Sequence, residues 1–89
     1  MESKQWTILW DEEAREDLKR IEKKDAERIT NKIEKFLVKD PIALGRKLTG
    51  NYKDYYRYRV GSYRVIYSIS KSKVTILILQ IGKRDEIYN

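Results

Sequence analysis

Apolar residues along this chain first follow a helical spacing and then a strand spacing. The β-rich run Trp6–Trp10 predicts a first strand. An apolar stripe at i, i+4 and i+7 then predicts a helix over about residues 12–23, with Asp11 as its N-cap. A second stripe predicts a helix over about residues 26–38, with Asp25 as its N-cap. We expect the stripe residues in the core: Ala14, Leu18, Ile21, Ala26, Ile29, Ile33, Phe36 and Leu37.

The second half of the chain has the pattern of a connecting segment followed by three strands. Residues 39–54 hold the single proline and two of the four glycines, and we expect a loop there. Two strands, Tyr55–Val60 and Tyr63–Ser70, are joined by Gly61-Ser62, a type II′ hairpin signal. The apolar run Val74–Ile81 predicts a central strand buried on both faces. The order β-α-α-β-β-β predicts an α+β domain, with two helices packed on one face of a mostly antiparallel sheet.

A two-residue turn fixes the register of the hairpin, and the register divides its side chains between two faces. Tyrosine and aliphatic side chains share the face expected under the helices: Tyr56, Tyr58, Val60, Tyr63, Val65, Tyr67 and Ile69. On the other face Arg59 stands opposite Arg64, and Arg57 lies two residues along, opposite Ile66. Like charges paired across two strands are unfavourable, by up to about 1 kcal/mol. The arrangement therefore indicates an anion site.

Composition sets the remaining limits. The chain has 89 residues, which predicts a single domain over residues 1–89 with one modest core. It has no apolar run of about 18 residues and no signal-peptide layout, so we expect no membrane partner. It has no cysteine and no histidine. The first absence fits a reducing cytoplasm, and the second removes the commonest general base and metal ligand. We therefore expect a cytoplasmic protein with no metal and no cofactor.

Charge is segregated along the chain. Residues 1–44 hold 10 Lys/Arg and 11 Asp/Glu, a net charge of −1, whereas residues 45–89 hold 10 Lys/Arg and 3 Asp/Glu, a net charge of +7. A basic half predicts a polyanionic partner, either nucleic acid or an acidic protein. If the last strand pairs beside Tyr63–Ser70, its end at Lys83-Arg84 brings Arg84 near Arg64. The alternative is that Arg59 and Arg64 point into water or pair with a nearby acid, which could be Asp54, Asp85 or Glu86.

The motifs resemble those of a known family. RVGSYRVIY, followed by an apolar strand and then IGKRDEIY, is similar to the RelE/ParE superfamily of toxins from type II toxin–antitoxin systems. The helical pair and DPIALGRKLTG resemble that family's helices and the loop that enters its sheet, so the resemblance runs from Trp6 to Tyr88. It implies a RelE-like fold and a toxin held inactive by an acidic, RelB-like antitoxin in a hetero-oligomer. In the RelE branch it implies metal-free cleavage of mRNA in the ribosomal A site.

The same resemblance implies a set of site residues. The catalytic positions fall on Arg57, Arg59, Arg64, Arg84 and Tyr88. Lys53 and Lys83 are added as RNA-binding residues. Arginine binds phosphate oxygens through paired donors and keeps its charge, so Arg64 and Arg84 suit stabilisation of the transition state. Tyr88 suits stacking on a base or orienting the 2′-OH.

The sequence departs from the best-known RelE pattern at two positions, where lysines are replaced by Arg57 and Arg59. Arginine is a poor base near neutral pH, so the proton acceptor stays open between Lys53, the ribosome and no dedicated base. Two other functions also stay open. One is a ParE-like poison of DNA gyrase without nuclease activity. The other is a catalytically weak module whose basic face only binds its antitoxin.

Overall fold

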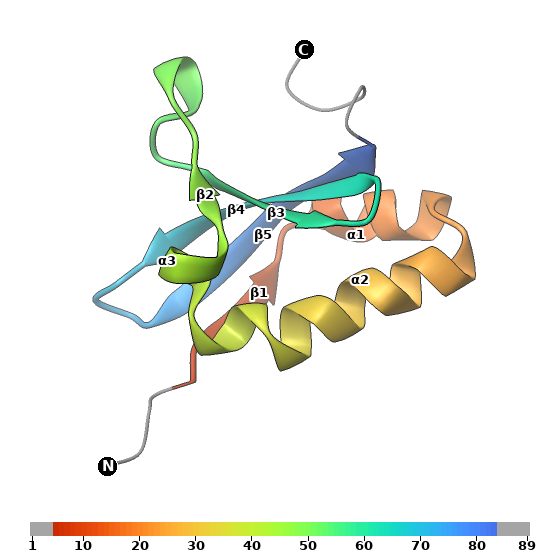
Figure 1. Ribbon diagram of the computed structural model, residues 1–89, viewed down its shortest axis with the longest axis horizontal. Helices are drawn as coiled ribbons and strands as arrows, with labels where there is room; N and C mark the ends of the chain where they lie inside the picture. Colours follow the sequence, from red (N-terminus) through yellow and green to blue (C-terminus); the bar gives the residue numbers. More distant parts are fainter. Residues whose placement is uncertain (1–4, 84–89) are drawn as a thin grey trace.

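A computed structural model describes residues 5–83, and its strands form one five-stranded sheet in the order β1-β5-β4-β3-β2 (Figure 1). The strands are β1 (Thr7–Trp10), β2 (Arg46–Lys47), β3 (Tyr56–Val60), β4 (Tyr63–Ser70) and β5 (Thr75–Lys83). The β1–β5 pairing is parallel, and the other three pairings are antiparallel. The prediction of a mostly antiparallel sheet is confirmed.

Two helices, α1 (Glu12–Arg20) and α2 (Lys23–Lys35), lie on the same face of the sheet, as predicted (Figure 1). None of the helices found in residues 5–83 has the length and apolar character of a membrane-spanning segment. The core between helices and sheet is made of small, aliphatic and aromatic side chains, the most buried of which are Ala14, Ile29, Ile33, Leu37, Val65, Tyr67, Ile76 and Ile78. The fold is therefore the predicted α+β domain.

The helix ends differ from the predicted ones. Asp11 caps α1 as predicted, because its carboxylate accepts a hydrogen bond from the Glu13 N–H at 3.2 Å. The prediction that Asp25 caps the second helix was wrong, since α2 begins at Lys23 with Glu22 before it. Asp25 lies in the first turn, where a carboxylate complements the helix dipole, and it accepts a hydrogen bond from the Tyr63 hydroxyl at 3.3 Å.

Phe36 is a second correction, because it was expected in the core and is 46% exposed. The α-helix ends at Lys35, and a 3₁₀ helix, η1 (Leu37–Lys39), follows. A 3₁₀ turn has 3.0 residues per turn, so the side chains after Lys35 leave the α-helical stripe on which the prediction was based. Leu37 turns inward and is fully buried, while Phe36 lies outside with the Lys32 ammonium 4.9 Å from its ring centroid.

Residues 39–54, predicted as a loop, contain structure of their own: α3 (Pro41–Leu44), strand β2 and a 3₁₀ helix, η2 (Gly50–Tyr52). A core tyrosine holds this segment on the sheet. The Tyr67 hydroxyl donates a hydrogen bond to the Pro41 carbonyl at 2.7 Å. Gly45 packs against that hydroxyl so closely that a Cβ at this position would lie 2.7 Å from the Tyr67 Cζ. The absence of a side chain at Gly45 therefore lets β2 begin beside β3.

The hairpin has the predicted register: Arg59 pairs with Arg64, Arg57 with Ile66, and Val60 with Tyr63. Gly61 has a φ of 60°. The φ of Ser62 is not positive, so the turn has the type II′ pattern. Strand β5 lies between β1 and β4, as expected for a central strand, and carries a register shift opposite the Ile66/Tyr67 step of β4. The prediction of burial on both faces was wrong, because Ile76 and Ile78 are fully buried whereas Leu77 and Leu79 are half-buried.

Candidate functional site: the arginine face of the sheet

The sheet face opposite the helices carries four arginines on three adjacent strands. Paired residues of a sheet project to the same side, so the pairing places these side chains in two rows across the strands. One row is Arg46–Arg57–Ile66–Gln80, and the other is Arg59–Arg64–Gly82. We refer to Arg46, Arg57, Arg59 and Arg64 as the arginine face.

Burial separates the two arginines that stand opposite each other. Arg64 is 8% exposed, and it is the one buried charged residue among residues 5–83, whereas Arg59 is exposed. A guanidinium is charged in proteins even when it is buried. Arg64 is therefore a charge fixed in place by its surroundings, and Arg59 is a charge free to adjust beside it. Both line a small hollow of about 190 Å³ at the turn end of the hairpin.

Three arginines of this face, Arg46, Arg57 and Arg59, have no acidic partner in the described part of the chain. The ion pairs there lie within α1 and α2, where Lys19, Arg20 and Arg28 bind acids three residues away. Within residues 5–83 no ion pair joins Arg46, Arg57 or Arg59 to a carboxylate. The alternative in which Asp54 pairs with Arg59 is therefore wrong. An anion that reached this face would meet several guanidinium groups together.

The other predicted site residues lie in different places. Lys53 is exposed and directly follows η2, on the loop that leads into β3. Lys83 pairs with Tyr63, so it shares the helix side of the sheet and not the arginine face. Arg84 and Tyr88 lie outside the described residues, and their roles stay predictions. Sequence reasoning missed Arg46 because it lies on a two-residue strand, which is too short for any periodic pattern.

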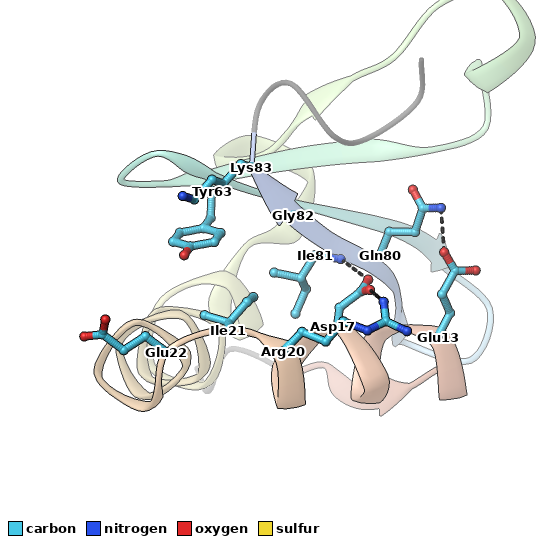
Figure 2. A pocket seen from close by; sticks show the side chains of 10 residues that line it. All are labelled: Glu13, Asp17, Arg20, Ile21, Glu22, Tyr63, Gln80, Ile81, Gly82 and Lys83. Atoms are coloured by element: carbon cyan, nitrogen blue, oxygen red, sulfur yellow. Dashed lines mark hydrogen bonds and ion pairs between the residues drawn. The ribbon is translucent and has the colours of Figure 1, made fainter.

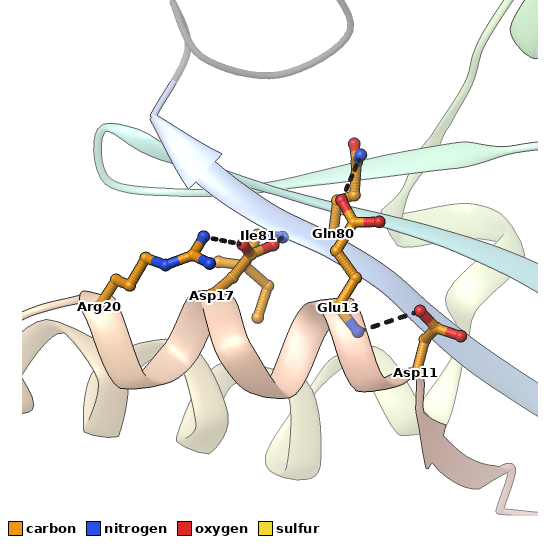
Figure 3. A network of polar contacts seen from close by, with 6 residues as sticks. All are labelled: Asp11, Glu13, Asp17, Arg20, Gln80 and Ile81. Carbon is orange, nitrogen blue, oxygen red and sulfur yellow. Dashed lines mark hydrogen bonds and ion pairs between the residues drawn. The ribbon is translucent and has the colours of Figure 1, made fainter.

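Lys83 and Tyr63 line a separate hollow of about 570 Å³ between the end of β5 and α1 (Figure 2). Here β5 runs on beyond β1, whose last residue, Trp10, pairs with Ile78. An acid on α1 takes the place of the missing strand, because the Asp17 carboxylate accepts a hydrogen bond from the Ile81 N–H at 2.9 Å (Figure 3). Helix α1 thereby supports the half of β5 that borders the arginine face.

A nearby contact also ties α1 to this half of β5. The Gln80 side-chain amide donates a hydrogen bond to the Glu13 carboxylate at 2.7 Å (Figure 3). Gln80 ends the first row of the arginine face, so this row runs from a guanidinium at one side of the sheet to an acid-bound amide at the other. Within residues 5–83 no three His, Cys, Asp or Glu side chains gather in a way that could hold a metal ion.

The fold and the site together define a class of protein. It is a small α+β domain with helices on one face of its sheet and basic residues on the other. The family model for the ParE toxin of type II toxin–antitoxin systems, parDE, matches residues 8–88. The chain therefore belongs to this toxin family, within the RelE/ParE superfamily that its motifs resemble. A comparison with curated protein sequences gave no match.

Solved structures with the same fold include toxins in complex with their antitoxins. The RelBE2 complex from Mycobacterium tuberculosis matches with a TM-score of 0.87 and 23% identity, over 91% of this chain and 100% of that chain. The intact E. coli RelBE complex matches with a TM-score of 0.73 and 25% identity, over 88% and 95% of the two chains. The archaeal RelE–RelB complex from Pyrococcus horikoshii OT3 matches with a TM-score of 0.71 and 24% identity, over 93% and 99%. These likenesses establish the RelE-like fold.

Proposed function

We propose that this toxin is a ribosome-dependent endoribonuclease that cleaves mRNA in the A site. The observation that carries the proposal is the cross-strand pair Arg59 and Arg64, held directly opposite each other with Arg57 in the next row. Two guanidinium groups in register cost folding energy. They gain a purpose when a phosphate lies between them, because arginine binds phosphate oxygens through paired donors. The RelE-like fold supports the same branch of the superfamily.

In the proposed reaction RNA supplies its own nucleophile. The 2′-oxygen attacks the adjacent phosphorus and loses its proton, and the bond from phosphorus to the 5′-oxygen breaks as that oxygen takes up a proton. Negative charge builds on the phosphate oxygens in between. Fixed donors aimed at that charge are the strongest help a protein can give, and loss of one such donor typically costs about 100- to 1,000-fold in rate. Arg64, held by burial, suits this role, and Arg59 adds a second donor from the facing strand.

The proposed reaction also needs groups that accept and donate the two protons. Arg57 and Arg59 suit phosphate binding and not base catalysis, because a guanidinium is a poor base. Lys53 lies exposed on the loop before β3, close in sequence to Arg57, and is the candidate base within the chain. The ribosome is the alternative source. Arg84 and Tyr88 complete the proposed site, in the roles of a further phosphate ligand and a base-stacking or hydroxyl-orienting group.

We also propose an acidic antitoxin as the cognate partner, bound over the arginine face. Support comes from charge, since residues 45–89 carry a net charge of +7, and from the RelE–RelB complexes that share the fold. Opposite charge across an interface speeds association and selects the partner. An antitoxin that covered Arg59 and Arg64 would exclude RNA from the same place. A complex that left both side chains accessible would contradict this mode of neutralisation.

The test is primer extension on mRNA translated in vitro, with and without the purified protein. New 3′ ends at A-site codons, absent from naked mRNA, are expected. Arg59→Ala should weaken them strongly, and it is preferred to Arg64→Ala because Arg59 is exposed and its loss leaves no cavity. Arg15→Ala is the matched control, an exposed arginine on α1, and should cleave like the parent. Absence of cleavage by the folded parent protein would refute the nuclease proposal.

A second candidate function is poisoning of DNA gyrase without RNA cleavage. The observation in its favour is that the matching family model is ParE, together with arginine at the two positions where the best-known RelE pattern has lysine. Inhibition of DNA supercoiling by the purified chain, with intact mRNA in the first assay, would establish it. Activity in neither assay would leave the third candidate, a module that only binds its antitoxin.

A further inference from the structure

A second hollow adjoins the arginine face, with an aromatic wall and a polar wall. It measures about 180 Å³, and its lining includes Tyr52, Tyr55, Ile66, Leu79, Gln80 and Glu13. Ile66 connects it to the arginine face, because Ile66 pairs with Arg57 on one side and with Gln80 on the other. Neighbouring strands lie about 4.8 Å apart, so Arg57 and Gln80 stand about 10 Å apart across the sheet.

The aromatic wall is presented by a hydrogen-bonded turn. The ring centroids of Tyr52 and Tyr55 are 6.4 Å apart with planes tilted by 47°, and each residue is 37% exposed. Backbone hydrogen bonds lock their loop, since the Tyr55 N–H donates to the Tyr52 carbonyl and the Leu48 N–H to the Tyr55 carbonyl, both at 2.9 Å. A planar base that entered the hollow would therefore stack on rings whose positions are already set.

The polar wall is formed by Asp11, Glu13 and Gln80, and it offers mainly hydrogen-bond acceptors. The Glu13 carboxylate is an acceptor, so the group that contacts it at 2.7 Å is the Gln80 amide nitrogen. Two acceptors, the amide oxygen of Gln80 and the second carboxylate oxygen of Glu13, and one donor, the second N–H of the Gln80 amide, are then left for a ligand (Figures 2 and 3). A phosphate is repelled by this wall, whereas a neutral ring with N–H groups on its edge is attracted. Guanine fits this wall best, because its Watson–Crick edge places a ring N–H beside an amino group.

We propose that this hollow binds the base of a nucleotide, with guanine preferred, while the phosphate of the same strand lies on Arg57. The proposal rests on the proposed function, because it assigns a base subsite to the RNA that the arginine face would hold. Charge divides the two parts of the ligand between the two ends of one row: the anionic phosphate goes to the guanidinium, and the neutral base goes to the acid-bound amide. The alternative role for Tyr52 and Tyr55 is structural, namely to cover Ile66, which is 3% exposed.

The first experiment titrates the full chain with guanosine 5′-monophosphate, cytidine 5′-monophosphate or inorganic phosphate and follows amide shifts by NMR. The guanine nucleotide should shift Ile66 and Leu79 in the hollow as well as Arg57, and inorganic phosphate should shift Arg57 alone. Tyr55→Ala should weaken guanine-nucleotide binding roughly 5- to 100-fold, which is the usual value of one stacked base. Tyr55→Phe, which keeps the ring and covers Ile66 equally well, should bind like the parent.

Three outcomes would overturn the subsite or part of it. Equal shifts from the guanine nucleotide and inorganic phosphate would remove the base pocket. Equal affinity for the two nucleotides would remove the guanine preference. Loss of binding in Tyr55→Phe would point to a role of the hydroxyl instead of stacking. None of these depends on cleavage, so a chain that binds guanine nucleotides here and leaves mRNA intact would refute the proposed function and keep the subsite.

A second experiment compares the cut sites of the variants by primer extension. Tyr55→Ala should change which codons are cut, because a base contact carries sequence preference. Arg59→Ala should lower cleavage at all codons alike, because a phosphate contact carries none. An unchanged codon profile in Tyr55→Ala would contradict a base-binding role during cleavage.

Discussion

The two faces of the β3–β4 hairpin come from alternate residues of the same strands, yet they are built for different ends. On the helix side, Val65 and Tyr67 are fully buried, and the tyrosine hydroxyl has a backbone partner. On the other side, Arg59 stands opposite Arg64, an arrangement that weakens the pairing of the strands. The buried side chains of the helix side stabilise the fold, whereas the repulsion between Arg59 and Arg64 opposes it. The contrast indicates that the arginines were not placed by the needs of folding.

Because the two faces alternate along each strand, the position of a mutation in β3 or β4 predicts whether it changes stability or activity. A change on the helix side should act on stability first and on activity through it. A change on the arginine face should act on activity while leaving the fold in place. Arg64 is the residue where the two effects mix, because it belongs to the arginine face and is also buried.

The largest expected effect is on the helix side. Tyr67→Ala removes a fully buried aromatic ring and its hydrogen bond to Pro41, so the free energy of unfolding should fall by about 3–5 kcal/mol. Ser68→Ala, at the next residue and on the opposite face, should stay within about 0.5 kcal/mol of the parent. Urea unfolding followed by far-UV circular dichroism measures both. Similar losses in the two variants would show that the faces are not energetically distinct.

The next effect is on activity. Arg59→Ala should lower the rate of mRNA cleavage about 100- to 1,000-fold, because a donor to the developing phosphate charge is lost. Its free energy of unfolding should be unchanged or higher by up to about 1 kcal/mol, since repulsion with Arg64 is relieved. Single-turnover cleavage on programmed ribosomes and urea unfolding give the two values. A destabilised variant would assign Arg59 a structural role and break the separation between the faces.

Gly45 links the two faces and should give a smaller, mixed effect. A methyl group at this position collides with the Tyr67 hydroxyl, and neither the buried ring nor the Arg57 carbonyl, 3.2 Å away, yields easily. Gly45→Ala should cost about 1–3 kcal/mol of stability and displace β2, and with it Arg46. Gly50→Ala is a useful comparison, because nothing lies within 4 Å there and its cost comes from a φ of 65° alone. Hydrogen exchange at Arg46 should rise only in Gly45→Ala.

The fold was predictable from sequence wherever the pattern was long enough. The alternation of Tyr56 to Arg59 and the Gly61 turn fixed the register of the hairpin, and the apolar stripes identified both helices. The prediction was wrong where tertiary contacts decide. Asp25 looks like a cap and instead binds Tyr63, and Phe36 follows a helical spacing after the helix has ended.

The candidate site was predictable in part for the same reason. Arg57, Arg59 and Arg64 lie on strands with a clear alternation, so their common face could be derived. Arg46 and Gln80 could not be added, because the first depends on a two-residue strand and the second on a register shift near Ile66. Neither leaves a periodic signal in the sequence. Tyr52 joins the face only through the fold of a turn, which sequence spacing does not reveal.

The smallest expected effect is on the pH dependence of stability, and it concerns Tyr67 on the helix side. Burial raises the pKa of the Tyr67 hydroxyl, and the neighbouring Tyr56, Tyr58 and Asp40 raise it further. A raised pKa in the folded state means that the unfolded chain loses this proton first, at its ordinary pKa of about 10. Stability from this group is therefore complete at neutral pH and is lost as the pH rises above about 10, by about 1.4 kcal/mol per pH unit. Tyr67→Phe should lose about 1 kcal/mol at pH 7 through the missing hydrogen bond.

The stability of Tyr67→Phe should fall less steeply than that of the parent between pH 10 and pH 11.5, because the variant lacks the contribution of the Tyr67 hydroxyl. The contribution of Tyr58 remains, since burial also raises the pKa of that hydroxyl. Urea midpoints measured across this range in parent and variant give the difference in slope. Parallel curves would mean that the core does not hold the Tyr67 hydroxyl protonated. A shallower curve for Tyr67→Phe would show that the helix side keeps this hydroxyl from water, in contrast to the exposed Arg59 on the other face.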